Sequence, residues 1–290
     1  MINKEALTIV YVDLETLKVS KKNHLDYFSY IGGIGLAYKI LEDNFERDPL
    51  ILAIGPFSGI YPYVSKTAVC FLQKNSIKEY YVGGKLATSL KFAGVDAVVL
   101  LGHSKSKVNV NISLDQYVAG GEETDFSLHP ESTTLKVEEN NIFIDDYFSV
   151  SGSLVHRKFI EKGVENIHII GDSSLSIFDN NGYDEAYEDL MEMLDKISVT
   201  PSTYASCSGC PVGCEFSNKG EVGTSSYLSH CLVSCSFADK IYTDISIVYR
   251  CLSVLGYTYT HEHLEFVEGK IKEIGERIYE KIADSKLKTE

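Results

Sequence analysis

Three cysteines stand close together in the run Cys207-Ser-Gly-Cys210-Pro-Val-Gly-Cys214. Cysteine thiolates are the usual ligands of iron–sulfur clusters, and a tight group of them also suits zinc. The glycines and the proline between the thiols allow the chain to bend sharply, so all three sulfur atoms can face one metal centre. Backbone N–H groups of such a loop can also donate to cluster sulfurs and tune the reduction potential. The spacing favours an iron–sulfur centre.

A 4Fe–4S cluster needs a fourth ligand, and three more cysteines follow downstream, at Cys231, Cys235 and Cys251. Of these we favour Cys235. Zinc remains an alternative, because a histidine could complete a mixed site with the thiols. The candidate histidines are His230, His261 and His263. Free thiols are the remaining alternative. Cys70 stands apart in a β-rich run, where we interpret it as a small buried hydrophobe.

The composition is that of an ordinary globular protein. The chain has 290 residues, of which 44% are hydrophobic and 23% charged. Its net charge of -14 argues against binding to nucleic acid, since contacts to phosphates need clustered Lys and Arg, and it favours a basic protein surface as partner. No apolar run reaches the roughly 20 residues that span a bilayer, and the N-terminus lacks the pattern of a signal peptide. We therefore expect a cytoplasmic protein without membrane contact.

The elements that must position the cysteines divide the chain into two parts. Runs rich in Val and Ile predict strands, and apolar spacing of three to four residues predicts helices. The predicted strands cover residues 7–14, 50–55, 67–72, 96–102, 108–113, 141–145 and 166–171. The predicted helices cover residues 35–45, 85–93, 153–162 and 183–197, and then 243–255 and 264–282 beyond Pro201.

We therefore expect an α+β fold in two domains. Residues 1–200 would form a domain of β-sheet with short helices, and residues 201–290 a cysteine-bearing loop with a smaller helical segment. The apolar stripe of 264–282 would either cover the first domain or bind a partner. The glycine-rich run 32–35 opens a helix and could cradle a phosphate, but it lacks the dinucleotide fingerprint and a P-loop lysine, so a structural turn is favoured.

Four stretches, in this order, resemble the tungsten-pterin aldehyde:ferredoxin oxidoreductase family. They are VDLETLKVS (12–20) with YIGGIGLAYKIL (30–41), then LILAIGPFSG (50–59), GGKLATSLKFAGVDAVVLLGHSKSKV (83–108) and CSGCPVGC (207–214). The resemblance implies a first domain of paired β-sheets that forms the base for two pterins holding tungsten. It also implies that Cys207, Cys210 and Cys214 carry a cluster that relays electrons to ferredoxin.

The resemblance further implies a cofactor site at the start of the helix near residue 85. Gly83 and Gly84 would approach pterin phosphates there, where N–H groups and the helix dipole favour an anion. Lys66 stands where the family usually has an arginine. It keeps the positive charge but cannot bind a phosphate through two parallel hydrogen bonds, as a guanidinium does. Tyr81 stands where an asparagine usually precedes the glycine pair.

Other departures concern the rest of the cofactor site. The glycine-rich stretch expected between about 171 and 190 is missing, and the glycine-leucine-aspartate motif would fall at residues 256–258 without its carboxylate. The chain is about half of the family length, so by the resemblance the second pterin motif, the family's fourth cluster cysteine and the substrate pocket are absent.

Two functions follow as expectations. The first is an aldehyde:ferredoxin oxidoreductase-like protein that binds a 4Fe–4S cluster and takes part in redox chemistry. A split enzyme, of which this chain is one subunit, is one form of this hypothesis. Its partners would be ferredoxin or a separate catalytic subunit, and a homo-oligomer is a further option. Aldehyde oxidation needs the tungsten–bispyranopterin, since no side chain can replace it. The alternative is a non-catalytic homologue that serves as a scaffold or assembly module.

Overall fold

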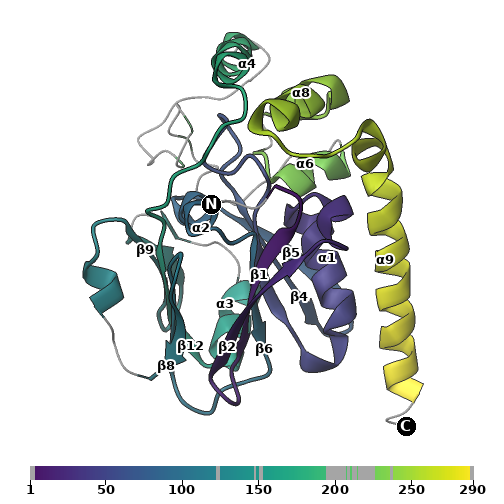
Figure 1. Ribbon diagram of the computed structural model, residues 1–290. Helices are drawn as coiled ribbons and strands as arrows, with labels where there is room; N and C mark the ends of the chain where they lie inside the picture. Colours follow the sequence, from purple (N-terminus) through teal and green to yellow (C-terminus); the bar gives the residue numbers. More distant parts are fainter. Residues whose placement is uncertain are drawn as a thin grey trace.

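The computed structural model describes most of the chain. The described residues are 4–121, 125–146, 148–149, 153–193, 207, 210, 214, 226–235 and 238–287. Within them, the strands form two six-stranded sheets, and helices lie between the sheets and on the outer face of one of them (Figure 1). The predicted α+β class is confirmed.

The first sheet has the strand order β2-β1-β6-β3-β4-β5. Only β1 and β6 pair in parallel, and every other neighbouring pair is antiparallel. Its strands are β1 (Leu7–Asp13), β2 (Lys18–His24), β3 (Leu50–Ala53), β4 (Thr67–Gln73), β5 (Ser76–Val82) and β6 (Ala97–Leu101). The predicted strands recovered β1, β3, β4 and β6, whereas the polar edge strand β2 and the tyrosine-rich β5 were missed because neither is an apolar run.

The second sheet has the order β11-β10-β9-β12-β7-β8. Here β12 and β7 are the parallel pair. The strands are β7 (Val108–Ile112), β8 (Tyr117–Gly120), β9 (Ser132–Val137), β10 (Ile142–Ile144), β11 (Phe148–Ser149) and β12 (Val164–Ile170). The predicted strands at 108–113, 141–145 and 166–171 recovered β7, β10 and β12, whereas β8, β9 and β11 were missed because they are short or polar.

The helices agree closely with the sequence pattern. They are α1 (Gly33–Asp43), α2 (Leu86–Phe92), α3 (Ser153–Lys162), α4 (Asn180–Glu192), α6 (Tyr227–Leu232), α7 (Asp239–Tyr242), α8 (Ile245–Leu255) and α9 (His261–Leu287). The α8 helix begins where the Asp244 carboxylate accepts from the N–H of Ser246 at 2.9 Å, and it ends at Gly256 in the left-handed region. The predicted helix over 183–197 begins earlier and ends at Glu192, and residues 194–200 lie outside the described part.

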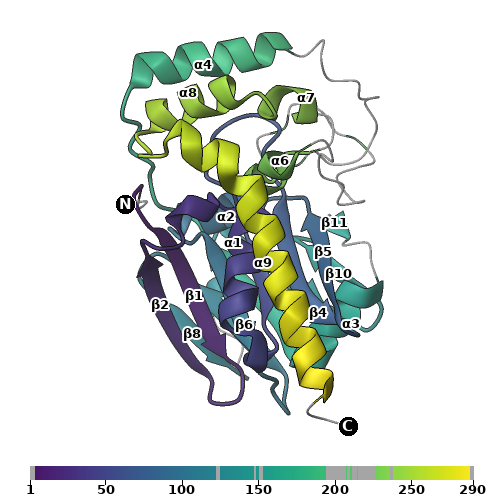
Figure 2. The ribbon, with the colours of Figure 1, turned by 90° about the vertical axis from the view of Figure 1, so that its right-hand side faces the viewer.

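The strands β1, β3, β4 and β6 of the first sheet are buried on both faces, and their sequences are accordingly apolar, whereas β2 and β5 at the edges are more polar. On β1, Val10 and Val12 point toward the second sheet, into an inner core that also contains side chains of α2 and α3. Ile9 points the other way, into an outer core shared with α1, α8 and α9. Figure 2 shows α9 running along α1 on this outer face. The apolar stripe of α9, from Leu264 to Ile282, is buried there, so it covers this chain's own sheet layer.

No helix among the described residues is both long enough and apolar enough to cross a membrane.

Candidate functional site

The segment 226–235, which carries α6, lies against the first sheet at the end where β4 begins and β5 ends. Two backbone bonds fix it: the N–H of Lys66 donates to the carbonyl of Val233 at 3.3 Å, and the N–H of Cys235 donates to that of Tyr63 at 3.1 Å. In both views α6 lies next to α1 at this end of the sheet (Figures 1 and 2). The helical part of the chain is thus tied to the loop between β3 and β4.

Glycines make this close approach feasible. A Cβ atom on Gly33 would lie 2.3 Å from the carbonyl oxygen of His230, and one on Gly55 would lie 2.3 Å from that of Leu232. Gly33 also has a φ of +46°, which an L-residue rarely adopts. The start of α1 is therefore filled by backbone of the 226–235 segment. The structural turn favoured for the glycine-rich run is confirmed, and no phosphate cradle exists there.

Tyr63 joins two of the predicted cysteines. Its side chain is buried, and its hydroxyl has no hydrogen-bond partner among the described residues. Burial, and to a smaller extent the thiols of Cys210 and Cys235, raise the pKa of Tyr63 to about 12. Both thiols thus act on the same phenol, although 25 positions separate them along the chain. Nothing in the sequence pattern singled out Tyr63.

The remaining cysteines lie in different surroundings. Cys207 is buried at the inner core, and the N–H of Cys210 donates to its carbonyl at 3.0 Å. Cys214 is half-buried. Across the described residues, no three His, Cys, Asp or Glu side chains stand close enough together to hold a metal ion. The cluster ligands Cys207, Cys210, Cys214 and Cys235 remain a prediction.

The two other downstream cysteines are core thiols. Cys231 is fully buried beside Gly35, and burial raises the pKa of its thiol to about 12. Cys251 is almost fully buried, and burial raises its pKa to about 12 as well. Cys70, which is fully buried in β4, matches its interpretation as a small hydrophobe. A thiolate ligand is disfavoured at such positions, because burial without a metal penalises the charged form.

Lys66 lies directly before β4, with 1% of its surface exposed. Next to it, the hydroxyl of Thr67 is buried and has no hydrogen-bond partner within the described ranges. The same holds for Thr88 on α2, whose side chain adjoins Gly59. Buried hydroxyls without partners are rare in folded proteins, so each of them needs an explanation. They gather where β4, the 55–66 loop and α2 meet.

The glycine pair Gly83-Gly84 forms a turn between β5 and α2, with Gly84 at a φ of +82°. The helix predicted over 85–93 is present as α2, which is one residue shorter at each end and seven residues long. Lys85 is its N-cap residue and provides no side-chain cap. Gly94 follows α2 with a φ of +68°, as predicted for the residue that ends this helix.

Tyr81 belongs to a polar group that sequence reasoning did not assemble. Its hydroxyl lies 2.9 Å from Nδ1 of His230 and donates to the Glu79 carboxylate at 3.1 Å. Tyr38 from α1 donates to the other oxygen of the same carboxylate. Burial, and then Glu79, raise the pKa of Tyr81 well above its ordinary value. The group links β5, α1 and α6, and it holds Tyr81 in a fixed place.

The paired sheets, the Gly83-Gly84 turn and the cysteine-bearing segment can now be set against known proteins. Residues 9–128 match the family model of the aldehyde ferredoxin oxidoreductase N-terminal domain. The resemblance seen in the sequence is thereby confirmed for this part of the chain. The aldehyde ferredoxin oxidoreductase match includes Lys66, Tyr81 and the glycine pair, and it ends before the first cysteine of the 207–214 run.

A solved structure shares the fold beyond the matched domain. It is described as the active site complex BamBC of benzoyl coenzyme A reductase in complex with 1,5-dienoyl-CoA. The TM-score is 0.56 at 20% sequence identity, over 65% of the present chain and 34% of the other. The present chain thus spans about a third of the length of that relative. At this identity the likeness establishes the fold of the aldehyde ferredoxin oxidoreductase-type domain and no more.

Proposed function

We propose that this chain is a redox-associated protein of the aldehyde ferredoxin oxidoreductase type that binds a 4Fe–4S cluster. Its ligands would be Cys207, Cys210, Cys214 and Cys235. The observation that carries this proposal is that Cys210 and Cys235 both pack against the outer core that contains Tyr63, and that the N–H of Cys235 donates to the Tyr63 carbonyl at 3.1 Å. Four cysteines, three of them within eight positions of the sequence, have the donor chemistry of such a cluster.

The choice of Cys235 as the fourth ligand rests on its surroundings. Cys231 and Cys251 belong to the outer core, where burial holds both thiols protonated. Cys235 is half-buried, and its backbone is fixed to the loop that carries Tyr63. The Tyr63 hydroxyl could donate a hydrogen bond to a cluster sulfur or to a ligand thiolate. Such hydrogen bonds tune the reduction potential of iron–sulfur centres.

A tungsten–bispyranopterin is the second cofactor that this family suggests, and it would supply the two-electron chemistry that side chains lack. The hydroxyls of Thr67, next to Lys66, and of Thr88, against Gly59, have no hydrogen-bond partner among the described residues, which is compatible with a polar ligand at this end of the sheets. In that arrangement Lys66 would contribute charge, and the Gly83-Gly84 turn would allow close backbone approach. Tyr81 would line the same region from β5.

A partner subunit is part of the proposal. The chain covers 34% of the length of its structural neighbour, and that neighbour is described as a complex. We propose that a separate catalytic subunit supplies substrate-binding groups, while ferredoxin or a similar carrier exchanges electrons with the cluster. Aldehyde oxidation by this chain alone is not proposed.

The cluster is tested by metal analysis of anaerobically purified protein. We expect iron and acid-labile sulfide near four of each per chain, with a broad visible absorption that bleaches on reduction. Cys210→Ser and Cys235→Ser should each lose most of the iron. Cys251→Ser is the matched control, since this thiol is buried in the outer core, and it should keep the iron if it folds.

Two results would reject the cluster assignment, and a third would reject Cys235 as its fourth ligand. A colourless and iron-free wild-type protein would exclude it outright. One zinc per chain without visible absorption would favour a structural zinc site. An equal loss of iron in folded Cys235→Ser and Cys251→Ser, checked by circular dichroism, would show that Cys235 has no special role.

The second candidate function is a non-catalytic scaffold or assembly module. It is favoured by Tyr81, whose hydroxyl is already engaged by Glu79 and His230 at a position where the family usually has asparagine. Tungsten or molybdenum bound together with pterin, in stoichiometric amounts, would rule the scaffold out. Protein that keeps its iron but contains neither metal would support it.

A further inference from the structure

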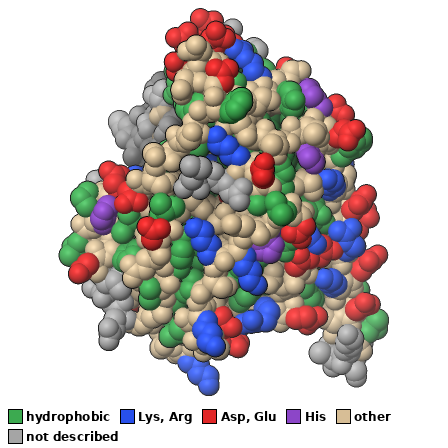
Figure 3. All heavy atoms as spheres, in the orientation of Figure 1, with side chains coloured by type: hydrophobic (Ala, Val, Ile, Leu, Met, Phe, Trp, Pro, Cys, Tyr) green, Lys and Arg blue, Asp and Glu red, His purple; other side chains and the backbone are tan. Residues whose placement is uncertain are grey.

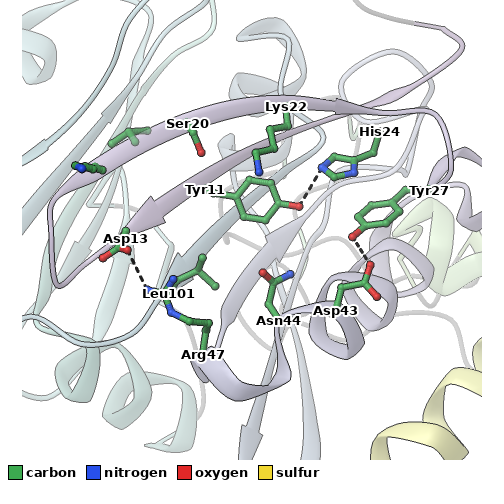
Figure 4. A pocket seen from close by; sticks show the side chains of 12 residues that line it. Tyr11, Asp13, Ser20, Lys22, His24, Tyr27, Asp43, Asn44, Arg47 and Leu101 are labelled. Atoms are coloured by element: carbon green, nitrogen blue, oxygen red, sulfur yellow. Dashed lines mark hydrogen bonds and ion pairs between the residues drawn. The ribbon is translucent and has the colours of Figure 1, made fainter.

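A polar hollow lies on the opposite side of β1 from the inner core, between the β1–β2 hairpin and the C-terminal end of α1. Its volume is about 680 Å³, and it is open to solvent. Figure 4 shows the side chains that line it, with Tyr11, Lys22 and His24 from the hairpin facing Asn44 and Arg47 from the end of α1 and beyond. It shares no residue with the candidate functional site.

The hairpin supplies a row of polar side chains on one face of the sheet. Successive residues of a strand point to opposite faces, so Lys18, Lys22 and His24 share the hollow's face, with Ser20 between the two lysines. Lys21 points the other way and donates to the hydroxyl of Tyr117 at 2.7 Å. Lys18 and Lys22 on β2 therefore face the hollow, whereas Lys21 lies on the opposite face of the sheet.

The carboxylates in the hollow are already engaged. Asp13 accepts from Arg47 at 3.0 Å and from the N–H groups of the turn that follows it. Asp43 accepts from the hydroxyl of Tyr27 and from Lys39, which lies 2.7 Å away. These pairs leave little negative charge to repel an anion.

The two lysines that face the hollow have weaker partners. Lys18 makes no ion pair with any described residue, and Lys22 lies 5.5 Å above the ring of Tyr11, which is a cation–π contact. Their charges stand out on a chain whose net charge is -14. Figure 3 shows basic side chains over the lower part of this face and acidic ones gathered at α4 and along α9. A small anion would thus be attracted locally.

Aromatic rings form one wall of the hollow. The imidazole of His24 stacks on the ring of Tyr27, with centroids 4.2 Å apart and 14° between the planes. Its Nε2 atom lies 3.2 Å from the Tyr11 hydroxyl, so the rings hold each other in place. Leu101 adds apolar surface. A cavity of this size and lining exceeds the needs of an inorganic anion and suits a small organic ligand.

We propose that this hollow binds a small molecule that carries a planar ring and an anionic group, either a phosphate or a carboxylate. Lys18 and Lys22 bind the anion, while the wall of Tyr11, His24 and Tyr27 takes the ring. Charge-assisted hydrogen bonds to the lysines supply the attraction, and contact with the fixed rings supplies the preference for a flat molecule.

Calorimetric titration of the full chain tests the proposal with two anion sources. AMP carries a phosphate and benzoate a carboxylate, and adenosine and benzamide are their neutral counterparts. We expect saturable binding of AMP or benzoate, and the one that binds identifies the anionic group. Its neutral counterpart should bind at least about tenfold more weakly, which corresponds to the loss of one strong polar contact.

Variants of the hairpin locate the site. The double variant Lys18→Ala/Lys22→Ala should weaken binding by about tenfold or more, whereas Lys21→Ala on the same strand should leave it within about twofold. The proposal is wrong if neither AMP nor benzoate shows saturable binding to the wild-type chain, or if the neutral counterpart binds as tightly as the anion. It is also wrong if Lys21→Ala weakens binding as much as the double variant does. Should the double variant not fold, the comparison of charged and neutral ligands on the wild type still decides.

Discussion

The Nζ atom of Lys91 lies 2.7 Å from the hydroxyl of Tyr257, although 166 positions separate the two residues. Lys91 is almost fully buried on α2, and it also pairs with Asp96 at 3.4 Å. Burial by itself would lower the pKa of Lys91, but Tyr257 and Asp96 outweigh it and raise that pKa. One buried ammonium thus ties the stretch after α8 to the matched N-terminal domain.

Replacing Lys91 by methionine should therefore destabilise the chain. The variant leaves the Asp96 carboxylate buried without its cation and Tyr257 without a partner, at a cost of about 3 kcal/mol in the free energy of unfolding. Urea unfolding followed by circular dichroism measures it. Lys85→Met, which removes an exposed ion pair to Glu131, should cost less than about 0.5 kcal/mol. Similar losses in both variants would contradict the structural role of Lys91.

Gly33 and Gly269 form a contrasting pair of glycines. Gly33→Ala should destabilise the chain by about 2 kcal/mol or more, because its φ is positive and the new Cβ would meet the His230 carbonyl oxygen. Gly269→Ala, in the middle of α9 with open space around it, should stabilise by about 0.5 to 1 kcal/mol. Thermal unfolding of both variants measures these effects. An unchanged Gly33→Ala protein would mean that the 226–235 segment does not pack at the start of α1.

The buried face of α9 should contribute strongly to stability. Ile274 is fully buried in the outer core, so Ile274→Ala should cost about 2 to 4 kcal/mol. Phe266 on the same helix is 60% exposed, and Phe266→Ala should change the free energy of unfolding by less than about 0.5 kcal/mol. Chemical unfolding of the two variants compares the faces directly. The opposite ranking would show that α9 packs through its other face.

The buried ammonium of Lys162 should make the stability of the chain depend on pH. This ammonium is fully enclosed, bonded to the Asp48 carboxylate at 3.0 Å and to the Gly102 carbonyl at 2.9 Å, and burial lowers its pKa from 10.5 to about 8. Below pH 8 both states hold the proton. Between about pH 8 and 10.5 the folded chain loses it first, so the unfolded state binds more protons and stability rises with pH.

The comparison with Lys162→Met isolates this effect. From pH 7 to pH 9.5, the free energy of unfolding of the wild type should rise relative to that of the variant by about 2 kcal/mol. The exposed Lys105→Met serves as the control for general charge effects. Lys162 would not be the cause if the wild type showed the same rise in the free energy of unfolding relative to Lys105→Met, or no rise relative to Lys162→Met.

Local patterns gave much of the fold. Apolar runs located β1, β3, β4 and β6, and glycines after helices marked the ends of α2 and α3 correctly. The edge strand β2 was missed because its side chains are polar, and its strand geometry comes from pairing with β1. The resemblance to a known family supplied the paired sheets, which no local pattern contains.

By itself, the sequence determined that three thiols share one short loop, that most strands of the first sheet are apolar on both faces, and that α9 has one apolar side. Only the tertiary structure decided that Cys235 is bonded to the backbone of Tyr63 and that Cys210 packs against the same outer core, while Cys231 and Cys251 are buried within that core. It also decided that α9 covers α1, and that Lys18 and Lys22 share a hollow with Arg47. The reason is physical: the spacing of residues along the chain fixes which side chains share a face, whereas contacts between distant segments depend on how the faces pack together.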